Sequence, residues 1–115
     1  MRMTKPDQPF GQVPAFRQGD AVLFESGAIC LWLAERHPGL LPVCDAGQAE
    51  AMSWTFAALS SIEPNILMLQ YVTLFRADAP GAKEFTPTVE AALADKLTLL
   101  AEALGDKEWL GGAFS

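Results

Sequence analysis

The chain has 115 residues, half of them hydrophobic, and its 14 acidic against 8 basic side chains give a net charge of -6. Such a chain can bury the core of one small domain or parts of two, which excludes wholesale disorder, while the acidic balance opposes binding to nucleic acid. No apolar run approaches the roughly 18 residues of a membrane helix, and no hydrophobic segment follows the basic start, so we expect a cytoplasmic protein without a membrane partner.

A β-hairpin is the first expected element. Short apolar runs at 12–16 and 21–24 flank the loop Arg17-Gln18-Gly19-Asp20. Glycine and aspartate adopt the unusual dihedral angles that hairpin turns require. Two strands alone are marginal in water, so we expect the hairpin to pack on a neighbouring element.

A helix is expected directly after the hairpin. Ser26 is its predicted cap, and the apolar residues that follow recur at helical spacing. Pro38 and Gly39 end the helix, with Arg36 near the negative end of its dipole. We expect Cys30, inside this helix, to be a buried and inert thiol.

Two longer helical segments follow a linker rich in Gly and Pro at 39–47. The first segment runs from about Gln48 to Phe75, and Pro64 should kink it or end it locally. The second is expected to begin at Thr86-Pro87, a cap followed by proline, and to end at Gly105. Each carries an apolar stripe; the residues are Ala49, Met52, Phe56, Leu59 and Ile62 in the first, and Val89, Leu93, Leu97, Leu100 and Leu104 in the second.

Metal chemistry has little support in the sequence. Cys30, Cys44 and His37 are the only cysteines and histidine, and no C-x-x-C pair occurs. We therefore expect reduced thiols and no metal site.

Two short groups suggest a binding site for a peptide. A cis bond between Val13 and Pro14 would turn the backbone N–H and C=O of Val13 outward, where an extended peptide can pair with them. Ser26 and the free N–H groups of the first helical turn suit a carboxylate, and Glu25 beside them suits an ammonium group. Taken singly, each group is more often an edge-strand proline or a plain helix cap.

Together and in this order, the groups resemble the cytosolic glutathione transferase family. The resemblance lies in three ordered segments and two later matches: Pro9-Phe10-Gly11-Gln12-Val13-Pro14-Ala15-Phe16, Leu23-Phe24-Glu25-Ser26-Gly27-Ala28-Ile29 and Leu33-Ala34-Glu35-Arg36-His37-Pro38, then Glu63-Pro64 and Trp109-Leu110-Gly111-Gly112-Ala113-Phe114-Ser115. It implies a mainly α fold with an α+β remnant. Residues 1–42 would be part of a thioredoxin-like domain, 43–47 a linker, and 48–115 part of an all-helical domain.

The resemblance also implies the roles of individual residues. Val13, before a cis Pro14, resembles the residue whose backbone pairs with the cysteinyl part of glutathione, and Gln12 occupies a position whose side chain or backbone often lies beside the tripeptide in that family. Glu25 and Ser26 resemble the pair that holds its γ-glutamyl end.

For the rest of the site, the resemblance points to a hydrophobic wall and to a dimer. Met68 and Tyr71 are candidates for the wall that faces a hydrophobic co-substrate, although residues at this spacing more often belong to a core. Family members also suggest a homodimer. The catalytic Tyr, Ser or Cys of family members precedes the Val-Pro segment. We expect the stretch that carries this catalytic residue to lie outside this chain.

Two functions remain open at this stage. The first is a glutathione transferase that conjugates the thiol to hydrophobic electrophiles, of which this chain is the central part. The second is a transferase-like binding or assembly module without catalysis, because fold does not determine chemistry. Ser115 would begin a capping box for a further helix.

Overall fold

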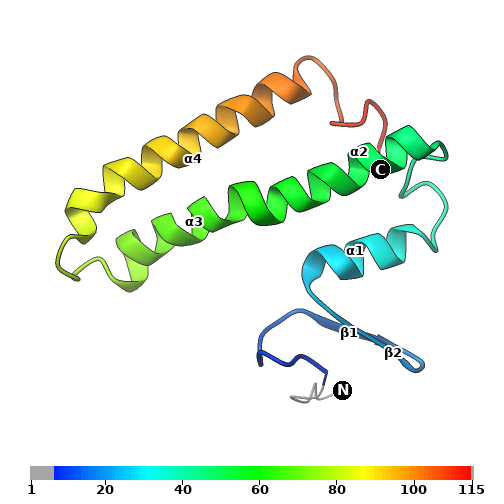
Figure 1. Ribbon diagram of the computed structural model, residues 1–115, viewed down its shortest axis with the longest axis horizontal. Helices are drawn as coiled ribbons and strands as arrows, with labels where there is room; N and C mark the ends of the chain where they lie inside the picture. The colour runs from blue at the N-terminus through cyan, green and yellow to red at the C-terminus, as the bar shows by residue number, and fades with distance from the viewer. Residues whose placement is uncertain (1–6, 115) are drawn as a thin grey trace. The chain divides into compact units, whose positions relative to one another are not determined.

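The computed structural model describes residues 7–114 and shows a β-hairpin followed by helices (Figure 1). The strands are β1 (Ala15–Gln18) and β2 (Ala21–Phe24), and the helices are α1 (Ser26–Ala34), α2 (Asp45–Ala57), α3 (Glu63–Gln70) and α4 (Ala82–Leu104). Two π-helical segments, η1 (Ala58–Ile62) and η2 (Tyr71–Phe75), follow α2 and α3. The chain divides into two compact units, one ending at Met52 and one from Ser53 to Phe114. The expectation for Ser115 lies outside the described residues.

The hairpin has a shorter loop than the sequence indicated. β1 and β2 pair antiparallel from Ala15 opposite Phe24 to Gln18 opposite Ala21, which leaves only Gly19 and Asp20 in the turn. Gly19 takes a φ of 58°, a conformation that glycine adopts without steric cost. The predicted four-residue loop was therefore too long, because Arg17 and Gln18 complete the ladder.

Helix α1 begins as predicted, but its cap differs. The residue at the N-cap position is Glu25, and no side chain caps the helix, so Ser26 is the first helical residue and not the cap. Cys30 is exposed, contrary to the expectation of a buried thiol. The reason is that α1 is apolar on all sides, while the strands β1 and β2 that pack against it can cover only part of its surface.

The long helical segment from 45 to 75 contains two π-helical segments, η1 and η2. α2 begins at Asp45, earlier than the predicted Gln48, and the backbone N–H of Gln48 bonds the Cys44 carbonyl at 3.0 Å. Before Pro64 the helix widens into η1, where the Glu63 N–H bonds the carbonyl of Ala58. A π-turn is one way for a helix to accommodate a proline, since proline lacks an N–H and crowds the preceding turn. The predicted local break at Pro64 is thus confirmed as a π segment.

Helix α4 begins earlier than the sequence indicated. Gly81, with a φ of 82°, is the N-cap, and its carbonyl accepts the Phe85 N–H at 3.0 Å. Thr86 is consequently inside the helix, where its hydroxyl donates to the Ala82 carbonyl at 2.8 Å, and Pro87 follows it. The predicted start at Thr86-Pro87 was wrong because the glycine cap and the buried Ala82 bring the start forward. Gly105 ends the helix as predicted.

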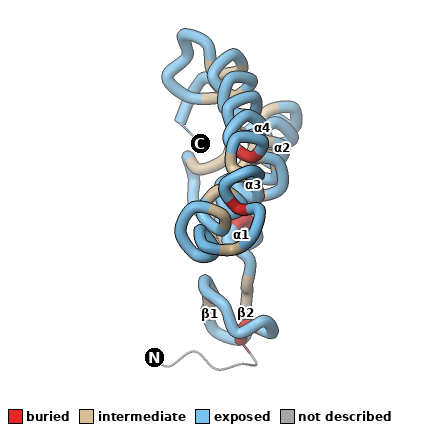
Figure 2. Tube along the Cα trace, turned by 90° about the vertical axis from the view of Figure 1, so that its left-hand side faces the viewer, coloured by how far each residue is buried: buried red, intermediate tan, exposed pale blue. Residues whose placement is uncertain are grey.

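The second unit has a small core. α4 contacts α3, η1 and η2, and Val89 and Ala82 are its buried apolar residues among those described. Figure 2 shows that most of the trace is exposed or half-buried. Of the two predicted stripes, Val89 is buried and Leu59, Ile62, Leu93, Leu100 and Leu104 are half-buried, whereas Ala49, Met52, Phe56 and Leu97 are exposed. Within the described residues, no helix is long and apolar enough to cross a bilayer.

Candidate functional site

The Val13–Pro14 segment leads into β1. The peptide bond between these residues is cis, as the resemblance implied, and the Val13 side chain is 85% exposed. Within residues 7–114, the backbone N–H and C=O of Val13 have no hydrogen-bond partner. Gln12, directly before Val13, is also exposed. An extended peptide can therefore approach this backbone as an added strand.

Glu25 joins the hairpin to α1 in an unusual conformation. It has φ 70° and ψ 121°, and it is the only non-glycine residue with positive φ in the described part of the chain. Such a backbone costs about 1–3 kcal/mol, and residues that carry it cluster at binding sites. Its side chain is exposed and able to receive a cation.

Two substitutions of Glu25 separate the effect of its backbone conformation from the effect of its carboxylate. Glu25→Gly removes the steric cost at positive φ, so we expect it to raise the free energy of unfolding by about 1 kcal/mol relative to Glu25→Ala. Both variants lack the carboxylate and should bind an ammonium group equally poorly. Thermal unfolding followed by circular dichroism measures the difference, and equal midpoints for the two variants would contradict it.

Ser26 is the first residue of α1, beside backbone N–H groups that the helix does not use. The first intrahelical bond runs from the Ile29 N–H to the Glu25 carbonyl at 3.0 Å. The N–H groups of Ser26, Gly27 and Ala28 therefore precede the helical ladder and carry the positive end of the helix dipole. With the exposed Ser26 hydroxyl, they form a set of donors suited to a carboxylate.

The hairpin register brings these two groups to one place. Ala15 pairs with Phe24, Pro14 immediately precedes Ala15, and Glu25 immediately follows Phe24. Strand partners lie about 5 Å apart, so the Val13–Pro14 segment and the start of α1 adjoin at the same end of the sheet. A ligand with a peptide backbone and a zwitterionic end can contact both.

The co-substrate candidates lie elsewhere. Met68 is in α3 and Tyr71 begins η2, so both belong to the second unit and not to the hairpin group. They are 45% and 51% exposed. With Leu67, Leu74 and Phe75, which are also exposed, they form an apolar stripe at helical spacing. Tyr71 and Met68 are thus surface residues of this chain, not members of its core.

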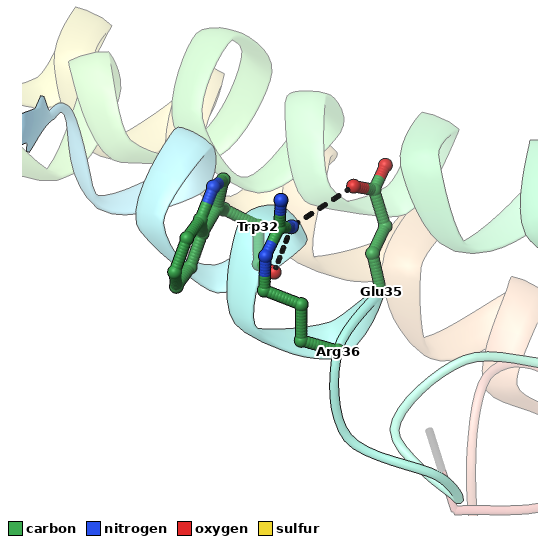
Figure 3. Close-up of polar contacts among 3 residues, drawn as sticks. All are labelled: Trp32, Glu35 and Arg36. Carbon is green, nitrogen blue, oxygen red and sulfur yellow. Dashed lines mark hydrogen bonds and ion pairs between the residues drawn. The ribbon is translucent and has the colours of Figure 1, made fainter. Parts of the chain in front are cut away.

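The far end of α1 carries a contact that sequence reasoning did not identify. The Arg36 guanidinium lies 3.8 Å from the centre of the Trp32 ring, and its Nη1 donates to the Trp32 carbonyl at 2.9 Å and to Glu35 at 3.5 Å (Figure 3). Trp32 and Arg36 are four residues apart, about one helical turn, and this spacing could have predicted their contact. A shallow hollow of about 520 Å³ lies beside them, lined by residues that include Leu31, Arg36, His37, Leu41 and Gln48. It contains none of the predicted site residues.

Comparison with known proteins shows which class of protein this chain resembles in sequence and fold. Residues 2–40 match the family described as glutathione S-transferase, N-terminal domain. The chain is 34% identical over 108 residues to glutathione S-transferase GstA of Escherichia coli O157:H7, covering 90% of this chain and 50% of the relative. It is 32% identical to glutathione S-transferase F9 of Arabidopsis thaliana, covering 93% and 53%.

Solved structures agree with these relatives. A glutathione transferase from Burkholderia graminis, whose crystal structure holds two glutathione molecules per subunit, superimposes with a TM-score of 0.86 at 28% identity, over 94% of this chain and 48% of that one. Glutathione transferase F2 from Populus trichocarpa gives 0.79 at 29% identity, over 96% and 55%. Residues 2–40 thus match this family, and about 90% of the chain is similar to glutathione S-transferases, with a thioredoxin-like hairpin and helix followed by a helical part. The chain spans about half the length of the relatives that it matches.

Proposed function

We propose that this chain supplies the glutathione-binding half of a glutathione transferase that conjugates the thiol to hydrophobic electrophiles. The observation that carries the proposal is the meeting of the free Val13 backbone with Glu25 and Ser26 at one end of the hairpin. The Val13 N–H and C=O pair with the cysteinyl main chain, and Gln12 lies beside the tripeptide. Ser26 and the α1 N-terminus hold the γ-glutamyl carboxylate, while Glu25 receives its ammonium group.

The domain layout follows from the same assignment. Residues 1–42 form part of a thioredoxin-like domain, 43–47 the linker and 48–115 part of the all-helical domain. Met68 and Tyr71 contribute to the wall that faces the electrophile. The residues of the proposed site bind glutathione. We assign to none of them the activation of the glutathione thiol. The protein is proposed to act in the cytoplasm as a homodimer.

Titration calorimetry with two ligands tests the binding proposal. Glutathione should bind this chain, and the dipeptide Cys-Gly should bind at least about tenfold more weakly, because it lacks the γ-glutamyl end that Glu25 and Ser26 hold. Absence of glutathione binding, or equal affinity for the two ligands, would contradict the site. Light scattering on the same sample tests the dimer, which a clean monomer would contradict.

A non-catalytic module is the second function that the site supports, because the assigned residues bind glutathione without activating its thiol. Spectrophotometry with a chloronitrobenzene electrophile separates the two functions in the longer protein. Conjugation there supports the transferase. Binding of glutathione without any conjugation supports the module.

A further inference from the structure

The loop from Asp7 to Pro14 carries the proposed peptide-binding backbone and is fastened to both strands of the hairpin. Its first fastening is an ion pair between the Asp7 carboxylate and the Arg17 guanidinium, which also share a hydrogen bond. The Asp7 side chain is only 8% exposed, whereas that of Arg17 is 42% exposed. Arg17 belongs to β1, so this pair joins the start of the loop to the strand that the loop enters.

The middle of the loop is held by its own hydrogen bonds. The buried Gln8 accepts the Phe10 N–H at its side-chain Oε1 at 2.6 Å, and its backbone carbonyl accepts the Gly11 N–H at 3.0 Å. Gly11 takes a φ of 68°, which turns the chain toward Gln12. These bonds define a tight turn directly before the proposed site.

The second fastening reaches β2. The Phe10 ring meets the Phe24 ring edge to face, with centroids 6.3 Å apart. Such aromatic pairs stabilise a fold by more than the burial of their apolar area alone provides. Because Phe24 directly precedes Glu25, this contact relates the loop to the other half of the proposed site.

We infer that Arg17 is a positioning residue, whose ion pair with Asp7 holds the loop so that the Val13 backbone is already placed for the glutathione peptide. This inference rests on the proposed function. Arg17 acts through the loop, since the ligand is assigned to Val13, Glu25 and Ser26. Holding the loop in its bound conformation removes an ordering cost that binding would otherwise carry.

Hydrogen exchange tests the fastening without any ligand. The Phe10 and Gly11 amides are bonded within the loop and therefore report its opening. Arg17→Met should speed their exchange by about tenfold, the change expected for losing one charged hydrogen bond. Asp7→Asn removes the same charge pair with little change of shape and should act similarly. Arg76→Met, which removes an exposed arginine from the second unit, is the matched control and should leave both amides unchanged.

Calorimetry then tests the positioning role. Arg17→Met should weaken glutathione binding by about five- to tenfold while the unfolding midpoint moves little, and Arg17→Lys should restore most of the affinity because it keeps the charge. Unchanged hydrogen exchange at the Phe10 and Gly11 amides overturns the inference that the Asp7–Arg17 ion pair holds the loop. Faster exchange with unchanged affinity overturns the positioning role, and a lysine variant as weak as the methionine variant overturns the ion-pair explanation. Failure of the unmodified chain to bind glutathione overturns the proposed function instead, while the exchange experiment still decides the fastening.

Discussion

Val89→Asp is expected to unfold the helical unit from Ser53 to Phe114. Val89 is 4% exposed and lies in α4, which packs against α3, η1 and η2. A carboxylate at this position loses its hydration without gaining a partner, at a cost of about 3–5 kcal/mol. A unit of this size seldom has more than about 3–5 kcal/mol of stability, so the folded state should no longer dominate.

A matched substitution on the same helix distinguishes burial from helix propensity. Leu99 is 58% exposed, and Leu99→Asp should change the free energy of unfolding by about 0.5 kcal/mol or less. Urea titration followed by circular dichroism measures both variants. Equal midpoints for Val89→Asp and Leu99→Asp would show that Val89 is not the centre of the core.

The apolar stripes identified the buried side of the helices only in part. Val89 of the second stripe is buried, and Leu93 and Leu100 are half-buried, because α4 repeats apolar residues over several turns and packs against α3, η1 and η2. Leu97 belongs to the same stripe and is 45% exposed. Periodicity predicts which residues share a helix face, but burial depends also on which elements cover that face.

The start of α4 shows where a local signal loses to tertiary structure. Thr86-Pro87 is a favourable helix start, yet Gly81 at φ 82° begins the helix and Ala82 is buried. A proline inside the helix leaves the Lys83 carbonyl without its usual partner, a cost that the packing of the earlier turn offsets. No local pattern at Gly81 indicated this, since a single glycine is equally consistent with a loop.

The residues of the candidate site could be predicted from the sequence better than the packing of the helices could. Gln12-Val13-Pro14 and Glu25-Ser26 were recognised as ordered motifs, and the cis bond before Pro14 is present. The positive φ of Glu25 was not foreseen, because glutamate seldom adopts it. Neither was the Asp7–Arg17 pair, since two charges ten positions apart meet only once the loop has folded onto β1.

Ser26→Ala is expected to weaken glutathione binding by about 10- to 100-fold without destabilising the chain. The hydroxyl is proposed to donate to the γ-glutamyl carboxylate, and a hydrogen bond to a charged group contributes about 1.5–3 kcal/mol. Had Ser26 been the helix cap, its loss would have cost about 1 kcal/mol of stability. Because Glu25 occupies the cap position and no side chain caps α1, the free energy of unfolding should stay within about 0.5 kcal/mol.

Affinity and stability must therefore separate in this variant. Ser60→Ala is the matched control, since the Ser60 hydroxyl donates to the Phe56 carbonyl in the second unit and should affect neither quantity strongly. Titration calorimetry gives the dissociation constant, and thermal unfolding gives the midpoint. Parallel losses of both in Ser26→Ala would indicate a structural serine. Unchanged affinity would contradict the assignment of the γ-glutamyl carboxylate to the α1 N-terminus. Only the Val13 backbone would then remain of the proposed site.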